Sequence, residues 1–230
     1  MAIKRKTSHK KAYIAILLLV LLIVATAALI YAALPGPAKA SAGVHVGDTF
    51  TYSIMGYSNL TDLNAVESPG FSQYNQTDHF KVTVNAVNGS SVTLETDWRF
   101  KNGTDVIVDQ TVDLSNGAES ITNGFWAIYT ANLNVGNLLR PTGFDKLTVN
   151  QTGTQDFTGG SRTKNFWYID NQFFDVNDPT HNTLRYDYTA VWFDKQTGML
   201  INLTNYSEYN NPAKVEVITW NLISSSVWNV

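Results

Sequence analysis

Cysteine is absent from the 230 residues, and histidine occurs only four times. The lack of thiols excludes disulfides and cysteine-based catalysis. His45, His79 and His181 are isolated in the sequence and form no H-E-x-x-H or H-x-H metal motif. The chain also lacks the G-x-S-x-G turn that presents the nucleophile of many hydrolases. We therefore expect a protein that is not an enzyme and needs no cofactor.

Acidic residues are missing from the first 43 positions, which hold six of the 16 Lys and Arg. Five of these basic residues precede an uncharged apolar run at 12–34. As a helix this run would reach roughly 35 Å, enough to cross a hydrocarbon core of about 30 Å. Basic residues before such a run favour a cytoplasmic N-terminus. We expect a single-pass cell-membrane protein with a cytoplasmic segment at 1–11, a transmembrane signal-anchor helix at 12–34, a linker at 35–43 and an extracellular domain at 44–230.

Two other interpretations of the apolar run remain open. Ala38-Lys39-Ala40 resembles the cleavage site of a secretory signal, although the apolar core of such a signal is typically only about 7–15 residues. Cleavage beside Lys11-Ala12 would instead give a pilin-like filament subunit, but the run lacks the early acidic residue of many pilins. A retained anchor is the favoured hypothesis.

Positive charge is scarce in the outer part of the chain. Residues 44–230 contain 10 Lys and Arg against 19 Asp and Glu, a net charge of −9. This balance disfavours a nucleic acid as partner. A domain of roughly 185 residues is long enough to bury a core without disulfides.

Alternating apolar residues and Asn-Gly pairs indicate an antiparallel sheet. The pairs begin at Asn88, Asn102 and Asn116, and glycine there supplies the backbone angles of tight hairpin turns. Between them, residues such as Val92 and Leu94 share one face of a period-two pattern. Strands are predicted at 49–54, 80–86, 92–100, 106–114, 146–150, 163–169, 184–193, 199–206 and 214–222.

The predicted fold is therefore all-β, with one antiparallel meander of about nine strands. It could form a half-barrel, a closed barrel or a sandwich. The segment 119–139 has no clean period and is expected to be a short helix or a crossing loop. Four tryptophans on predicted strands are candidates for core or ligand-lining positions: Trp98, Trp167, Trp192 and Trp220.

Sequons for N-linked glycans are frequent, which favours a cell-surface glycoprotein. Six are predicted to be modified: Asn59, Asn75, Asn88, Asn102, Asn150 and Asn202. A seventh, Asn205, overlaps the last of these in MLINLTNYSEY. If Ile201 and Leu203 face the core, Asn202 faces water and Asn205 faces inward, so Asn205 is expected to carry no glycan.

Two groups of carboxylates are candidate sites. Asp105, Asp109 and Asp113 are four residues apart, or about 13 Å along a strand, which exceeds the 5–9.5 Å of a glycosidase pair. They are predicted to form a solvated strand face. A weak candidate for calcium is the acidic loop with Asp170, Asp175, Asn177 and Asp178, because clustered oxygens suit hard cations.

Three stretches carry a resemblance to known proteins: VHVGDTFTYSI, TANLNVGNLL and VWFDKQTGMLINLT. The chain resembles a group of uncharacterised archaeal surface proteins with one N-terminal membrane segment and one outer β domain rich in Asn-x-Ser/Thr. The resemblance implies a surface location. It does not imply any particular activity. A weaker similarity, at the level of shape, is to lipoprotein-carrier half-barrels, which share the curled meander and a late D-x-x-T-G turn.

Two functions follow as hypotheses. The first is a surface or envelope component that contacts neighbouring envelope proteins and has a packed interior. The alternative is a carrier or sensor whose curled sheet holds an apolar, lipid-like molecule. The two hypotheses differ in the volume of the cavity behind the face formed by Val82, Val92 and Val106: the first predicts a filled space and the second a hollow one.

Overall fold

The computed structural model describes residues 16, 19, 22–24, 26, 40–173 and 185–230. It divides into two units, Met1–Ala38 and Lys39–Val230, and the second holds the β domain. Most of the predicted span at 12–34 lies outside the described residues. Among the residues that are described, no helix has the length and apolar character needed to cross a membrane.

The described part of the β domain contains nine strands, as the alternation predicts. Most are longer than expected, because their polar outer ends continue the pairing. Their bounds are β1 Thr49–Leu60, β2 Thr77–Asn88, β3 Ser91–Phe100, β4 Asp105–Asp113, β5 Gln151–Phe157, β6 Gly160–Phe173, β7 Arg185–Asp194, β8 Leu200–Asn210 and β9 Ala213–Ser225.

One predicted strand is misplaced. Residues 146–150 are not part of a named strand, and β5 begins at Gln151. Lys146 has a left-handed φ of 54°, which interrupts an extended run, and Val149 is buried in the core. The apolar alternation of this stretch therefore reflects packing of a loop against the core.

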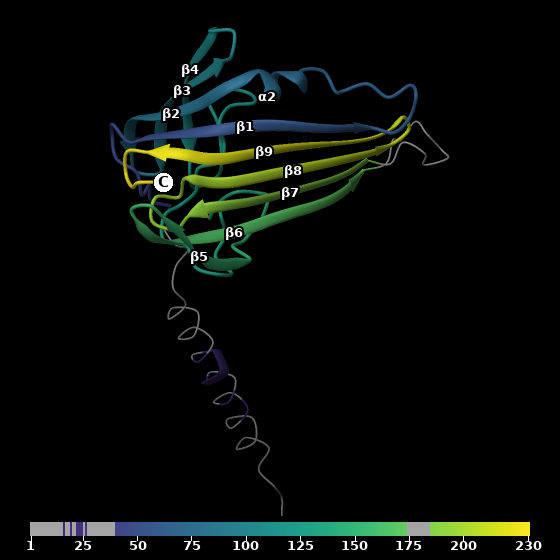
Figure 1. Cartoon of the computed structure of the whole chain (residues 1–230). Coiled ribbons are helices and arrows are strands. Elements are labelled where there is room, and N and C mark those ends of the chain that lie inside the picture. Colours follow the sequence, from purple (N-terminus) through teal and green to yellow (C-terminus); the bar gives the residue numbers. More distant parts are fainter. Residues whose placement is uncertain (1–15, 17–18, 20–21, 25, 27–39, 174–184) are drawn as a thin grey trace, which may run out of the picture. The chain divides into compact units, whose positions relative to one another are not determined.

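The strands form one open, curled sheet in the order β4-β3-β2-β1-β9-β8-β7-β6-β5, with every neighbour antiparallel (Figure 1). Because β4 and β5 are the two ends of this order and do not pair with each other in the described part of the chain, the sheet is neither a closed barrel nor a two-layer sandwich. Two sets of strands that are consecutive in the sequence, β1 to β4 and β5 to β9, meet where β1 pairs with β9. The half-barrel is thus the predicted architecture that agrees with the structure.

Glycine forms the tight turns at the predicted places. Gly89, Gly103 and Gly117 have φ values of 62°, 88° and 79°, which only glycine adopts at little cost. Gly198, with φ of 77°, ends the turn between β7 and β8. There the fully buried Asp194 accepts hydrogen bonds from Arg162 Nε at 2.7 Å and from the Thr197 backbone N–H at 2.8 Å.

A crossing segment, 114–150, connects the two edges of the sheet and covers part of its concave face. It is a loop rather than a helix, which resolves the two predictions for 119–139. Ile128 is fully buried and bridges to Met199, the residue before β8. The buried Gln110 of β4 holds the segment by donating to Phe125 O at 2.6 Å and accepting from Phe125 N–H at 2.9 Å.

The core occupies one end of the curled sheet. Phe50, Tyr52, Val82, Leu94 and Val112 all face it and are buried, as their parity predicts. The crossing segment does not cover the inner face of the sheet toward the other end. Apolar side chains of that part of the inner face, such as Ile218 and Trp220, are only partly buried.

A short helix, α2 (Ser72–Gln76), covers part of that remaining face. It follows Phe71, which is buried and packs over Gly56 of β1. A Cβ at Gly56 would lie 3.1 Å from the Phe71 ring, so the close approach depends on glycine. Sequence patterns do not predict this helix, because five residues are too few to show a period.

Candidate functional site

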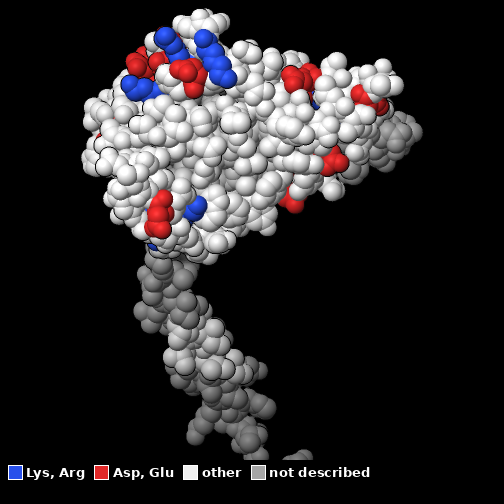
Figure 2. Space-filling view, viewed as in Figure 1, with Lys and Arg blue, Asp and Glu red and all other residues white. Residues whose placement is uncertain are grey.

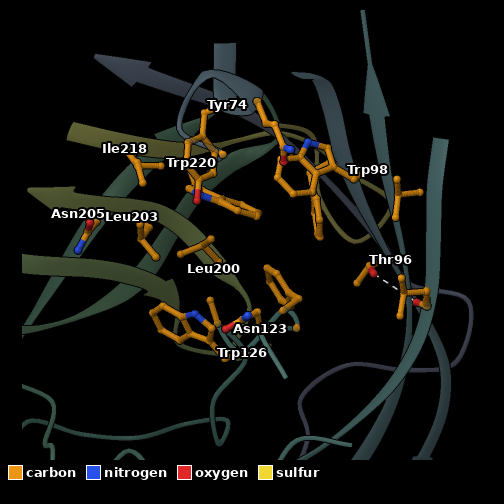
Figure 3. Close-up of a pocket in the computed structure, with 18 of the residues that line it drawn as sticks. Tyr74, Thr96, Trp98, Asn123, Trp126, Leu200, Leu203, Asn205, Ile218 and Trp220 are labelled. Atoms are coloured by element: carbon orange, nitrogen blue, oxygen red, sulfur yellow. Dashed lines mark hydrogen bonds between the residues drawn. The ribbon is translucent and has the colours of Figure 1, made fainter. Parts of the chain in front are cut away.

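A cavity of about 750 Å³ lies where the crossing segment and α2 leave the concave face uncovered (Figure 3). Its walls come from the inner faces of β3, β4, β7, β8 and β9. The lining residues are Pro69, Gly70, Gln73, Tyr74, Phe80, Thr96, Trp98, Val106, Val108, Ile121, Thr122, Asn123, Gly124, Phe125, Trp126, Ala127, Thr189, Leu200, Leu203, Asn205, Ile218 and Trp220.

Aromatic rings in mutual contact form the floor. The centroid of Phe80 lies 4.9 Å from that of Trp220, 6.0 Å from that of Phe125 and 6.1 Å from that of Trp98. The pairs with Trp220 and Trp98 are edge-to-face and the pair with Phe125 is stacked, and both arrangements are favourable beyond their buried area. The floor is therefore a rigid apolar surface, since each ring is fixed by its neighbours.

The wall beside α2 is fixed by stacking and by a hydrogen bond. Tyr74 stacks on Trp98 with a centroid separation of 6.1 Å, and Trp98 Nε1 donates to Thr77 Oγ1 at 2.7 Å. Burial raises the pKa of Tyr74, so its hydroxyl is neutral at physiological pH. The indole of Trp98 thus presents an apolar face to the cavity with its N–H already satisfied.

Polar residues lie at the opposite wall, on β7 and β8. Asn205 Nδ2 donates to Thr189 Oγ1 at 2.9 Å. Farther along the same inner face, Ser207 Oγ donates to Asp187 Oδ1 at 2.6 Å, and Asp187 pairs with Arg185 at 3.0 Å. The inner face of β8 therefore changes from Leu203 to amide and hydroxyl groups within a few residues.

The four candidate tryptophans have three different environments. Trp98 and Trp220 line the cavity, whereas Trp167 is buried in the core. Trp192 is on the opposite face of the sheet from its buried neighbours Val191 and Phe193, where Lys164 Nζ lies 4.2 Å above its ring. Trp192 is therefore not among the residues that line the cavity.

Two aromatic residues of the cavity carried no clear sequence signal. Trp126 is part of the crossing segment and Tyr74 of α2. The apolar run around Trp126 did stand out as lacking a strand period. Its packing across the concave face explains that irregular pattern.

The structure places five of the six predicted glycan sites at exposed positions: Asn59, Asn75, Asn88, Asn102 and Asn150. Asn202 is half-buried and donates to Asn221 Oδ1 at 2.6 Å. Asn205 lines the cavity, in agreement with the predicted inward parity. Modification of any of these residues stays a prediction.

The candidate calcium loop cannot be assembled from described residues. Asp170 is exposed on β6, and Asp175, Asn177 and Asp178 lie outside the described residues. Within 40–173 and 185–230, no group of three or more His, Asp or Glu is placed to hold a metal ion. Asp105 pairs with Arg99 at 2.6 Å, as expected of a solvated strand face.

A second cavity, of about 180 Å³, surrounds the buried Arg140. Its Nη2 donates to Trp126 O at 3.0 Å, and its guanidinium carbon lies 5.0 Å from the centre of the Tyr129 ring. Burial lowers the pKa of Arg140 and raises that of Tyr129. Asp145 also lines this cavity, and its carboxylate opposes the binding of an anion.

No protein-family model matches the chain, and no curated protein sequence matches it. Among solved structures, the chain is similar to a "putative lipoprotein" from Parabacteroides distasonis ATCC 8503. The identity is 11%, the match covers 82% of this chain and 99% of the other, and the TM-score is 0.41. A similarity at this level identifies no function.

Proposed function

We propose that the β domain binds an apolar small molecule in the large cavity and acts as a carrier or sensor at the cell surface. The observation that supports this function is the aromatic-lined space of about 750 Å³ on the concave face. Ligand sites are typically about 300–1,000 Å³, mostly apolar, and largely preformed. The concave face is therefore not completely filled by side chains, which favours the carrier over a packed surface component.

The cavity is a built feature, because separate contacts keep its walls apart. Gln110 holds the crossing segment at Phe125, and Phe71 holds the α2 wall against Gly56. Each Å² of apolar surface removed from water contributes about 25 cal/mol. A ligand that covers the exposed parts of Trp98, Trp126 and Trp220 would gain this contribution without rearranging the sheet.

Two features of the sequence, the apolar run at 12–34 and the sequons, support a location at the cell surface. A membrane anchor at 12–34 would tether the β domain to a membrane, whose lipids are a source or a destination for an apolar ligand. Exposed sequons such as Asn88 and Asn102 support an extracellular domain. The archaeal surface proteins that the chain resembles would share this location.

Photolabelling of the full chain tests the proposal. The probe is dodecanol carrying a diazirine, and the labelled peptides are mapped by mass spectrometry after irradiation. We expect label on the peptides that contain Trp98 and Trp220, and competition by unlabelled dodecanol. Label distributed over the outer surface, without competition, would contradict the proposal.

A matched pair of variants on β9 provides the control. Ile218 lines the cavity, whereas Thr219 is on the opposite face of the same strand. Ile218→Trp places a larger side chain in the cavity, beside Trp220, and should lower site-specific labelling at least about tenfold, equivalent to a loss of about 1.4 kcal/mol in binding. Thr219→Trp should leave the labelling unchanged.

The outer face of the sheet favours a second candidate, contact with envelope proteins. A row of side chains crosses four strands, from Tyr188 through Tyr206 and Val217 to Tyr57. Tyr57 is 63% exposed. Figure 2 shows that charged side chains on the face in view gather mainly over the β3–β4 hairpin, while the surface over β6 to β9 is largely uncharged. Exposed tyrosines are typical of protein interfaces.

Site-specific crosslinking in intact envelopes tests the second candidate. Benzoylphenylalanine at Tyr57 should give one discrete crosslinked species. The same group at Val135, which is exposed in the crossing segment, should give none. Equal crosslinking from both positions would count against a docking role for the outer face.

A further inference from the structure

The cavity is lined by 22 residues, and none of these described residues is charged. We infer that its ligand is a neutral amphiphile, an apolar body ending in a hydroxyl or amide group, and that the polar end lies at Asn205 and Thr189. This inference rests on the proposed function and specifies the class of molecule that the same cavity takes.

The absence of charge in the described lining argues against an ionic ligand. Burying a carboxylate or ammonium group without a partner costs several kcal/mol. The charged side chains along the inner face beyond the lining are already compensated: Asp187 pairs with Arg185 at 3.0 Å, and Lys214 pairs with Glu216 at 3.0 Å. A fatty acid or an alkylamine would therefore leave its charge unpaired in the cavity.

The Asn205–Thr189 pair offers both kinds of hydrogen bond. Asn205 uses one N–H to reach Thr189 Oγ1, and it keeps a second N–H. Within the described residues the Thr189 hydroxyl donates to no acceptor, so its hydrogen can serve a ligand, and both side chains retain acceptor lone pairs. A ligand hydroxyl or amide, which also donates and accepts, matches this pair.

Asn205 and Thr189 form a hydrogen-bonded polar pair in one part of the lining, whereas Thr96, which lies on β3 with Trp98, already donates its hydroxyl to Val108 O at 3.2 Å. Figure 3 shows Asn205 and Trp98 at opposite sides of the labelled residues, with Trp220 between them. Leu203 is adjacent to Asn205 on the inner face of β8, and Leu203 pairs with Trp220 of β9. An amphiphile whose head lies at Asn205 would thus extend its apolar body over Trp220 toward Trp98.

Competition among three dodecyl compounds tests the inference. Dodecanol, dodecanoate and dodecylamine are each titrated against the diazirine probe on the full chain near neutral pH. We expect dodecanol to compete at least about tenfold better than either ion, a difference of about 1.4 kcal/mol. If dodecanoate or dodecylamine competes as well as dodecanol, the inference is wrong while ligand binding stands. If site-specific labelling itself is missing, the proposed function fails.

An isosteric variant locates the polar end. Asn205→Asp places a carboxylate at the inferred head position, so dodecylamine should gain at least about tenfold relative to dodecanol. Asn202→Asp makes the same change on the outer face of β8, where the side chain contacts Asn221, and should alter neither competitor. An unchanged preference in Asn205→Asp would show that the head does not lie there.

Discussion

Asn202 and Asn205 are three positions apart on β8 and face opposite sides of the sheet. Asn205 Nδ2 donates to Thr189 within the cavity lining, and Ser207 of its sequon is buried. Asn202 is half-buried on the outer face and is reachable once its contact with Asn221 opens. We expect peptide mapping of protein from a glycosylating host to find glycan on Asn202 and none on Asn205.

The opposite pattern, glycan on Asn205 and none on Asn202, would overturn the assignment of faces. A glycan on Asn205 would also be incompatible with a ligand cavity at this wall, because the sugar would occupy it. Asn88, exposed beside the β2–β3 turn, serves as the internal control for active glycosylation.

Glu216 is a buried carboxylate that anchors the loop before α2. It accepts hydrogen bonds from Ser68 N–H at 2.6 Å and from Lys214 Nζ at 3.0 Å, and Lys214 also donates to Val66 O at 2.9 Å. Burial alone would raise the pKa of Glu216, but the bonds from Ser68 and Lys214 outweigh it and hold the pKa below its usual value.

The lowered pKa of Glu216 predicts an acid-dependent loss of stability. The group binds protons more weakly in the folded state, so its contribution is complete above the unfolded pKa of about 4.3 and disappears as pH falls through the folded pKa. Glu216→Gln should cost about 3 kcal/mol at neutral pH, because it leaves Lys214 unpaired, and should flatten the decline in acid.

Urea unfolding followed by tryptophan fluorescence, from neutral pH down through the acidic range, measures the loss of stability and its pH dependence. Glu208→Gln, a change at an exposed position of β8, is the control and should keep the wild-type pH dependence. If Glu216→Gln keeps that dependence too, the buried ion pair is not its source.

At the scale of elements, the turn between β7 and β8 fixes the crossing segment. The Tyr129 N–H donates to Gly198 O at 2.9 Å, and a Cβ on Gly198 would overlap the Tyr129 carbonyl oxygen. Gly198 also has a left-handed φ of 77°. The turn and the segment therefore approach each other at a distance that only glycine permits.

Gly198→Ala should destabilise the fold by about 3 kcal/mol, since overlap with Tyr129 adds to the cost of a left-handed alanine. Gly136→Ala is the matched control: its φ is 83° but its Cβ would meet no atom within 4 Å, so we expect a loss of about 1 kcal/mol. Urea midpoints of the two variants provide the comparison. Equal losses would mean that the contact with Tyr129 contributes nothing.

For the molecule as a whole, β9 is the strand that unites the sheet. It pairs with β1 on one side and β8 on the other, although it is last in the chain. It also supplies Trp220 to the cavity and Leu222 to the core. Folding must therefore bring the two ends of the domain together, a contact that carries a large loop-closure cost.

A chain that ends at Asn211 should not fold, because β1 and β8 would each lose one of their two partner strands and the two halves of the sheet would no longer be joined. Loss of the near-ultraviolet circular dichroism signal is the expected result. Deleting Asn229 and Val230 is the control, since it removes two hydrogen bonds at the β5–β6 turn and leaves every strand in place. A native spectrum from the longer truncation would contradict the central role of β9.

The sequence by itself determined the local features. Period-two alternation gave eight of the nine strands and the inward parity of residues such as Phe50, Leu94 and Asn205. Asn-Gly pairs gave the turns. These features depend on neighbours within a few positions, where side-chain parity and the backbone freedom of glycine act. The same reasoning failed at 146–150, where a loop packed against the core mimics a strand.

Only the tertiary structure decided the pairing of β1 with β9, the path of the crossing segment and the presence of the cavity. An apolar strand face looks the same in sequence whether it is filled or hollow. The difference depends on sheet curvature and on where Trp126 and Tyr74 come to rest, which are set by contacts between residues far apart in the chain. Trp192 illustrates a different point. Its position in β7 places the ring on the outer face of the sheet, so its environment follows from the alternation of the strand and not from its being aromatic.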